Sequence, residues 1–206
     1  MMTAGVLTDR VSTFGRANPW LKRAALLAIG VALMWISAKI KVATIPVPVT
    51  MQTLVVVAIG MAYGARMGAA TMIAYLALGA AGQPVFAGTP ELGIGLPYML
   101  GSTGGYLAGF VLAAGATGWL AERGWDRNIL TATAAMAVGM VALFLPGALW
   151  LAYGFPLTAF GASFAGIGFE KAIEFGVAPF VWIDAMKLAL AAVGFPLIWK
   201  LIGGRI

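Results

Sequence analysis

Residues 177–202 read VAPFVWIDAMKLALAAVGFPLIWKLI, a stretch whose only charged residues are Asp184, Lys187 and Lys200. A helix of about 20 mostly apolar residues crosses the roughly 30 Å hydrocarbon core of a bilayer. The stretch shows no period-two alternation, which the strands of a membrane β-barrel require. It therefore predicts a transmembrane helix that carries two charges within its length.

The composition of the whole chain agrees with a membrane protein. Of the 206 residues, 62% are hydrophobic and only 10% are charged, whereas a soluble domain carries about 25% charged residues. The chain has no Cys and no His, which removes thiolate chemistry and the commonest metal ligand. No catalytic motif is present, so we predict no catalytic residue, metal or cofactor. The net charge of +6 is dispersed, which argues against a nucleic-acid partner.

Six segments fit membrane-spanning helices, and we predict an all-α, six-helix membrane bundle with both termini in the cytoplasm. The predicted spans are residues 20–40, 49–63, 67–81, 104–121, 129–153 and 177–202. Residues 1–19 would form a cytoplasmic tail, and residues 20–206 a single membrane domain. In this orientation only three basic residues of the connections lie outside, namely Lys39, Lys41 and Lys171. The distribution agrees with the rule that cytoplasmic loops carry an excess of Lys and Arg.

The connections that face outward in this orientation are long and rich in proline and glycine. Pro46 and Pro48 impose an extended backbone on residues 41–50, and residues 161–179 include a short helix expected around Glu170 and Glu174. Long structured loops on one face of a bundle usually carry function. We therefore expect loops 41–50 and 82–103 to close over a solute that enters from outside.

Asp184 and Lys187 are the strongest candidates for a binding site. A spacing of three places both side chains on one face of a helix. A charge at mid-membrane costs about 2.5–3.5 kcal/mol, so it persists only with a partner. Two interpretations remain open: a salt bridge that only fixes helix packing, or a site in which Asp184 meets an amide-like N–H and Lys187 meets a carboxylate.

Two further patterns are weaker. Ser102 and Thr103 precede Gly104, where they would cap a helix or where a ligand would approach the free backbone N–H groups. Small residues recur every four positions on the first predicted helix, which serves internal packing or a docking face for another membrane subunit. These residues are Ala24, Ala28 and Ala32.

Three stretches together resemble the BioY family, whose members are biotin-binding S components of energy-coupling factor transporters. They are Ile45–Leu54 (IPVPVTMQTL), Gly82–Gly88 (GQPVFAG) and Gly101–Phe110 (GSTGGYLAGF), with the Asp184–Lys187 pair in the last helix. The resemblance covers roughly residues 39–193. Ser102 departs from the pattern, in which we expect proline, but the glycines around it remain.

The resemblance implies a bacterial inner-membrane protein that captures biotin and works with a transmembrane coupling subunit and two cytosolic ATPases. It implies that Asp184 accepts the ureido N–H groups and that Lys187 neutralises either the ligand carboxylate or Asp184. Tyr106, Phe86 and Trp182 would flank the rings, and Gln52 or Thr103 would add hydrogen bonds. Ala24, Ala28 and Ala32 would dock the coupling subunit. Two alternatives are an S component for thiamine or riboflavin, and a scaffold subunit without a solute pocket.

Overall fold

The computed structural model describes residues 5–10, 18–42, 45–154 and 164–202, and most of these residues are helical. The long helices are α2 (Pro19–Lys39), α3 (Gln52–Tyr63), α4 (Ala65–Ala80), α6 (Gly104–Ala121), α7 (Ile129–Tyr153) and α9 (Ala178–Leu201). The short elements are α1 (Leu7–Arg10), β1 (Lys41–Val42), β2 (Val49–Thr50), α5 (Gly95–Met99), η2 (Trp125–Arg127) and α8 (Phe169–Gly176).

Local sequence signals explain where these helices begin and end. The side chain of Asn18 accepts a hydrogen bond from the Trp20 backbone at 3.0 Å, with proline at the first position of α2. Asn128 caps α7 in the same way at 2.8 Å. Gly64 has a φ of +82° and joins α3 directly to α4, a conformation that favours glycine.

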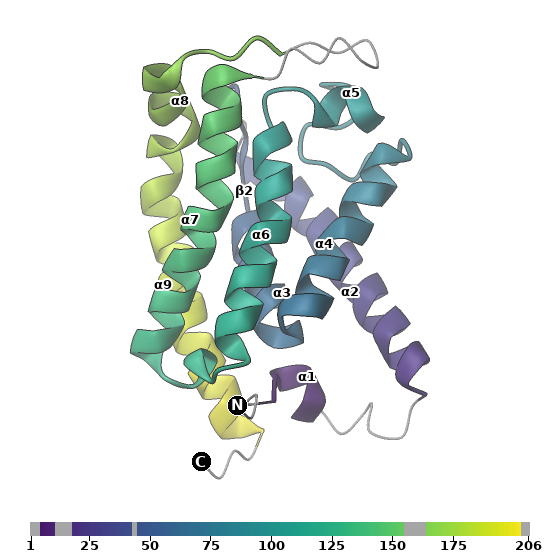
Figure 1. The fold of residues 1–206 in the computed structure, drawn as a ribbon, viewed down its shortest axis with the longest axis vertical. Coiled ribbons are helices and arrows are strands. Elements are labelled where there is room, and N and C mark those ends of the chain that lie inside the picture. Colours follow the sequence, from purple (N-terminus) through teal and green to yellow (C-terminus); the bar gives the residue numbers. More distant parts are fainter. Residues whose placement is uncertain (1–4, 11–17, 43–44, 155–163, 203–206) are drawn as a thin grey trace.

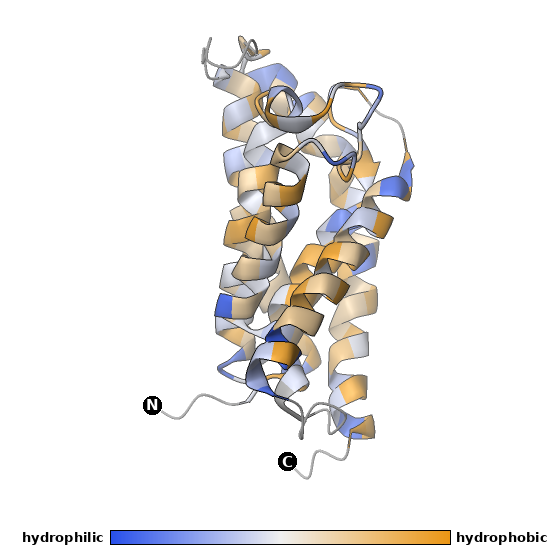
Figure 2. Ribbon diagram, turned by 90° about the vertical axis from the view of Figure 1, so that its right-hand side faces the viewer, coloured by the Kyte–Doolittle hydropathy of each residue, from blue (hydrophilic) through white to orange (hydrophobic). Residues whose placement is uncertain are grey.

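Among the residues that the structure describes, four segments are long and apolar enough to cross a membrane, and they contain α2, α6, α7 and α8–α9. Helices α3 and α4 are shorter, with 12 and 16 residues, and at 1.5 Å per residue they span about 18 and 24 Å. A helix lies in each of the six predicted ranges, but within the described part of the chain only four segments meet the length and hydropathy of a full span. Hydrophobic residues run along the helices, and hydrophilic residues gather toward the two ends (Figure 2).

Helix α3 is short because the chain before it is not helical. Helix α1 and the C-terminal end of α9 lie at one end of the molecule, and α5 and α8 lie at the other (Figure 1). The chain reaches α3 from the α5 and α8 end of the molecule through β2. Strand β2 pairs with β1 in antiparallel register, with Lys41 opposite Thr50 and Val42 opposite Val49. Extended backbone therefore takes the place of a helical turn above α3, where Pro46 and Pro48 disfavour helix.

Helix α6 is the centre of the bundle. It packs against α3, α4 and α7, and 61% of its apolar span is buried. The contact with α7 is close because α6 is rich in glycine: a Cβ added at Gly109 would lie 2.5 Å from the Leu143 carbonyl oxygen. Small residues allow this approach of two backbones in lipid.

Candidate functional site: a cavity backed by a buried ion pair

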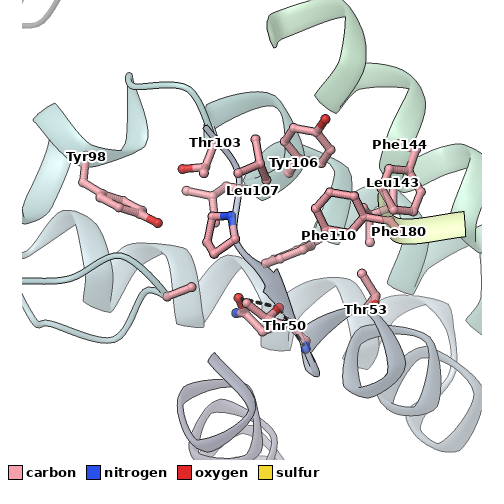
Figure 3. Close-up of a pocket in the computed structure, with 14 residues that line it drawn as sticks. Thr50, Thr53, Tyr98, Thr103, Tyr106, Leu107, Phe110, Leu143, Phe144 and Phe180 are labelled. Carbon is pink, nitrogen blue, oxygen red and sulfur yellow. Dashed lines mark hydrogen bonds between the residues drawn. The ribbon is translucent and has the colours of Figure 1, made fainter. Parts of the chain in front are cut away.

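A cavity opens between β2 and the helices in the half of the molecule that holds α5 and α8. Its lining atoms surround about 450 Å³ of empty space, which includes open solvent at the mouth of the cavity. Figure 3 shows side chains from several elements converging on it. The lining residues are Val47, Pro48, Thr50, Gln52, Thr53, Ala87, Tyr98, Thr103, Tyr106, Leu107, Phe110, Leu143, Phe144 and Phe180.

One wall is aromatic. The ring centroids of Tyr106, Phe144 and Phe180 lie 5.3 to 6.4 Å from one another, within the range of favourable aromatic pairs. The Tyr106 hydroxyl donates to the Gly176 carbonyl at 2.8 Å. In Figure 3 this hydroxyl points away from the other lining residues, so the Tyr106 ring supplies apolar surface to the cavity.

The opposite wall is polar and comes from β2 and the first turn of α3. The Gln52 side-chain amide donates to the Tyr75 hydroxyl at 2.9 Å, and its backbone N–H donates to the Thr50 hydroxyl at 3.2 Å. The Tyr75 hydroxyl in turn donates to the Val85 carbonyl at 2.9 Å. This chain of bonds fixes the orientation of the Gln52 amide at the edge of the cavity.

Asp184 and Lys187 lie behind this polar wall and form a buried ion pair. The Lys187 ammonium lies 2.6 Å from Asp184 Oδ1, and only 7% and 4% of the two side chains are exposed. Lys187 also donates to the Thr50 carbonyl at 2.7 Å and to the Thr53 hydroxyl at 3.1 Å. An ammonium has three donors, so all three are in use.

The two carboxylate oxygens of Asp184 differ. Oδ1 accepts from Lys187 and from the Thr53 hydroxyl, the latter at 2.8 Å. Oδ2 is buried and has no hydrogen-bond partner among the residues that the structure describes. Asp184 lies one helical turn after Phe180, on the same face of α9, and Phe180 lines the cavity. One acceptor of a buried carboxylate therefore has no partner among the described residues, and it lies behind the polar wall and not in the cavity lining.

Some of the predicted site residues line the cavity, and the others lie outside its lining. Gln52, Thr103 and Tyr106 line the cavity. Phe86 is buried one layer out, between the rings of Tyr75 and Tyr98, to which it lies 5.4 and 5.2 Å away.

The remaining site residues lie outside the lining. Gly104 is packed against the indole of Trp150, 2.9 Å from an added Cβ. The prediction for Trp182 is corrected, because its side chain is 80% exposed. With 3.6 residues per turn, position 182 faces away from the side of α9 that carries Phe180, Asp184 and Lys187.

Sequence analysis misses most of the lining residues. Those on the long helices, such as Leu107, Phe110 and Leu143, are apolar residues in apolar spans, and those in the connections carry no distinct signal. Two had a usable signal. Phe180 precedes Asp184 by one turn, and Thr53 lies in the same proline-rich stretch as Gln52. Ser102, the departure from the family pattern, donates to the Pro46 carbonyl at 3.0 Å and so ties the start of α6 to the extended segment.

The small-residue stripe on α2 is exposed, as a docking face requires. Ala24, Ala28 and Ala32 all face outward. Ala28 and Ala32 line an open apolar groove between α2 and α4. The other lining residues are Leu27, Val31, Trp35, Ala74, Ala77 and Leu78.

Comparison with known proteins gives one consistent result. The model of the BioY family matches residues 8–204. The chain is 34% identical to a probable biotin transporter BioY of Pyrococcus horikoshii, over 84% of this chain and 93% of that protein. It is 33% identical to the biotin transporter BioY of Thermotoga maritima, over 79% and 86%.

A solved structure supports the fold. The S component for biotin from an ECF-type ABC transporter matches with a TM-score of 0.70 at 22% identity, over 89% of this chain and 94% of that chain.

Proposed function

Because the chain belongs to the BioY family, we propose that it is the biotin-binding membrane subunit of an uptake system. It is a multi-pass membrane protein, and its relatives are named as biotin transporters. The observation that carries the proposal is the buried Asp184 Oδ2, which has no hydrogen-bond partner among the described residues and lies behind the polar wall of a largely apolar cavity. Biotin has matching chemistry: two ureido N–H donors on an apolar ring system, and a carboxylate on a flexible chain.

The geometry favours one arrangement of the ligand. The ureido ring would face Thr53 and Asp184, where Oδ2 would accept one N–H, and the aromatic wall would cover the rings. The carboxylate would then extend toward Thr103 at the first residues of α6. Since the donors of Lys187 are already used, its role is to neutralise Asp184 and hold the polar wall. Of the two roles expected for Lys187, the structure favours this one.

The membrane arrangement belongs to the same proposal. Helices α3 and α4, although short, would complete six spans, because the segment at residues 45–51, which includes β2, covers the depth that α3 does not. Both termini would lie in the cytoplasm, so the cavity would open outward in a bacterial inner membrane. The groove at Ala28 and Ala32 would receive a transmembrane coupling subunit, which would work with two cytosolic ATPases.

A ligand panel tests the proposal directly. The purified chain is heated in detergent with biotin, thiamine or riboflavin, and its unfolding temperature is measured. We expect biotin alone to raise the unfolding temperature, because a ligand that binds only the folded state stabilises it. A shift with thiamine or riboflavin alone would identify a different vitamin carrier. No shift with any ligand would favour a scaffold subunit.

A further inference from the structure

Two lysines hold the segment that closes one side of the cavity. Lys39 donates to the carbonyl oxygens of Phe86 and Thr89 at 3.0 and 2.9 Å, and Lys41 donates to the carbonyl of Ala87 at 2.5 Å. The partners are about 50 residues apart in sequence. Hydrogen bonds from an ammonium are charge-assisted and stronger than neutral ones. We call residues 86–89 the lid and the two side chains the lysine clamp.

The lid is a part of the cavity wall, because Ala87 lines the cavity. The Ala87 carbonyl accepts from Lys41 and the Thr89 carbonyl accepts from Lys39. The lid belongs to neither a helix nor a strand, so no backbone ladder holds it. The two ammonium groups attach it to α2 and β1.

The ends of the lid region can bend. Gly82 and Gly93 bracket it with φ values of +89° and +96°, and an added Cβ at either position would meet nothing within 4 Å. These unpacked glycines tolerate backbone rotation at little cost. On its inner side the lid is held by the buried Phe86 ring and by a hydrogen bond from the Gly88 N–H to the Tyr98 hydroxyl at 3.1 Å. The lysines hold its outer side.

The two lysines of the clamp lie where α2 ends and β1 begins. Lys39 is the last residue of α2, and Lys41 is the first of β1. Strand β1 pairs with β2, whose Thr50 forms the polar wall. The clamp thus joins the lid to the end of α2 and to the strand that pairs with the polar wall, and neither lysine lines the cavity itself.

We propose that Lys39 and Lys41 are positioning residues that control how fast the ligand enters and leaves by keeping the lid closed. This inference rests on the proposed function, because it requires a ligand in the cavity. The clamp forms hydrogen bonds with the lid and not with the ligand. Its removal should therefore shift the equilibrium between the closed and the open lid by the same factor, whether or not the ligand is bound. Association and dissociation should then accelerate together, and the affinity should stay nearly constant.

The experiment measures the association and dissociation rates of tritiated biotin on the purified full chain. The variants are Lys39→Met, Lys41→Met and the double variant, which keep an unbranched stem and remove the ammonium. Both lysines are exposed, so the variants should fold, and their unfolding temperatures verify this. Because exposure weakens each bond, we expect both rates to rise about threefold for either variant and about tenfold for the pair, with Kd changed less than about twofold.

Two controls separate the clamp from general effects of charge. Lys171→Met removes another exposed lysine that the sequence places on the same face, and it should leave both rates unchanged. Lys39→Arg keeps a cationic donor and should restore most of the slow exchange. Unchanged rates in the double variant would overturn the clamp, as would faster dissociation with a proportional loss of affinity. Failure of the wild-type chain to bind biotin would instead reject the proposed function.

Discussion

The buried pair Asp184–Lys187 makes a quantitative prediction about stability. The perturbations are Asp184→Asn, Lys187→Met and the double variant. Asparagine has nearly the volume of aspartate and methionine nearly the length of lysine, so little space is opened or filled. Each single variant leaves one charge without its ionic partner, while Thr53 and the Thr50 carbonyl remain as neutral partners.

The magnitude follows from burial. The pair is 2.6 Å apart and at least 93% of each side chain is buried, since 7% and 4% are exposed. Removing one partner of such a pair costs about 3–5 kcal/mol, whereas replacing both by neutral groups is often close to neutral. We expect each single variant to lose about 3 kcal/mol and the double variant less than about 1 kcal/mol, which gives a coupling energy of about 5 kcal/mol.

Thermal unfolding in detergent, followed by tryptophan fluorescence, measures these changes. For a chain of this size about 1 kcal/mol corresponds to roughly 2–4 °C, so the single variants should melt about 6–12 °C below wild type. The double variant should melt within a few degrees of wild type. Additive losses in the double variant would refute the reasoning, because they would mean that the two charges do not compensate each other in the folded protein.

Three other perturbations have definite expected outcomes. Gly109→Ala should lower the unfolding temperature, because the added Cβ would lie 2.5 Å from the Leu143 carbonyl oxygen. Gly115→Ala on the same helix is the control: its Cβ would meet nothing within 4 Å, so this variant should be neutral or stabilising. Equal effects of the two variants would contradict the close α6–α7 contact. Burial raises the pKa of Asp126 above its ordinary value of 3.8, so the folded state binds its proton more tightly and stability falls as pH rises through the raised pKa. Asp126→Asn should flatten this fall in an unfolding-temperature series from about pH 4 to 8, and an unchanged slope would exclude Asp126 as its source. Ala28→Trp should fill the α2–α4 groove and abolish biotin uptake by cells while the purified chain still binds biotin; normal uptake would reject the groove as the docking face.

The helices were predictable because apolar runs in this chain end at strong local signals. The predicted ranges 104–121 and 129–153 coincide with α6 and α7, which are bounded by glycine, charged residues and the Asn128 cap. The hydrophobic run predicts a helix start at residue 49, three residues before α3 begins at Gln52. The extended backbone that Pro46 and Pro48 impose continues into β2, and hydrophobicity alone does not distinguish a buried strand from a buried helix.

The site was predictable only where a residue type is unusual in its surroundings. Charges in an apolar helix singled out Asp184 and Lys187, and their mutual contact is present in the structure. Their position behind Thr50 and Thr53 was not foreseen, because it depends on how β2 packs against α9. The lysine clamp was also hidden, since Lys39 and Lys41 resemble ordinary charges at the end of a span. Residues 1–4 and 11–17 lie outside the described part of the chain, and they make up most of the predicted tail. Residues 203–206 of the predicted membrane domain also lie outside it.

The position of bound biotin tests the central claim most directly. An experimental structure of the chain with biotin should show the ureido ring beside Thr53, with one N–H within hydrogen-bond distance of Asp184 Oδ2, and the rings against Tyr106 and Phe180. Biotin bound elsewhere, for example in the groove between α2 and α4, would contradict the account. So would biotin in the cavity with its ureido group turned away from Asp184.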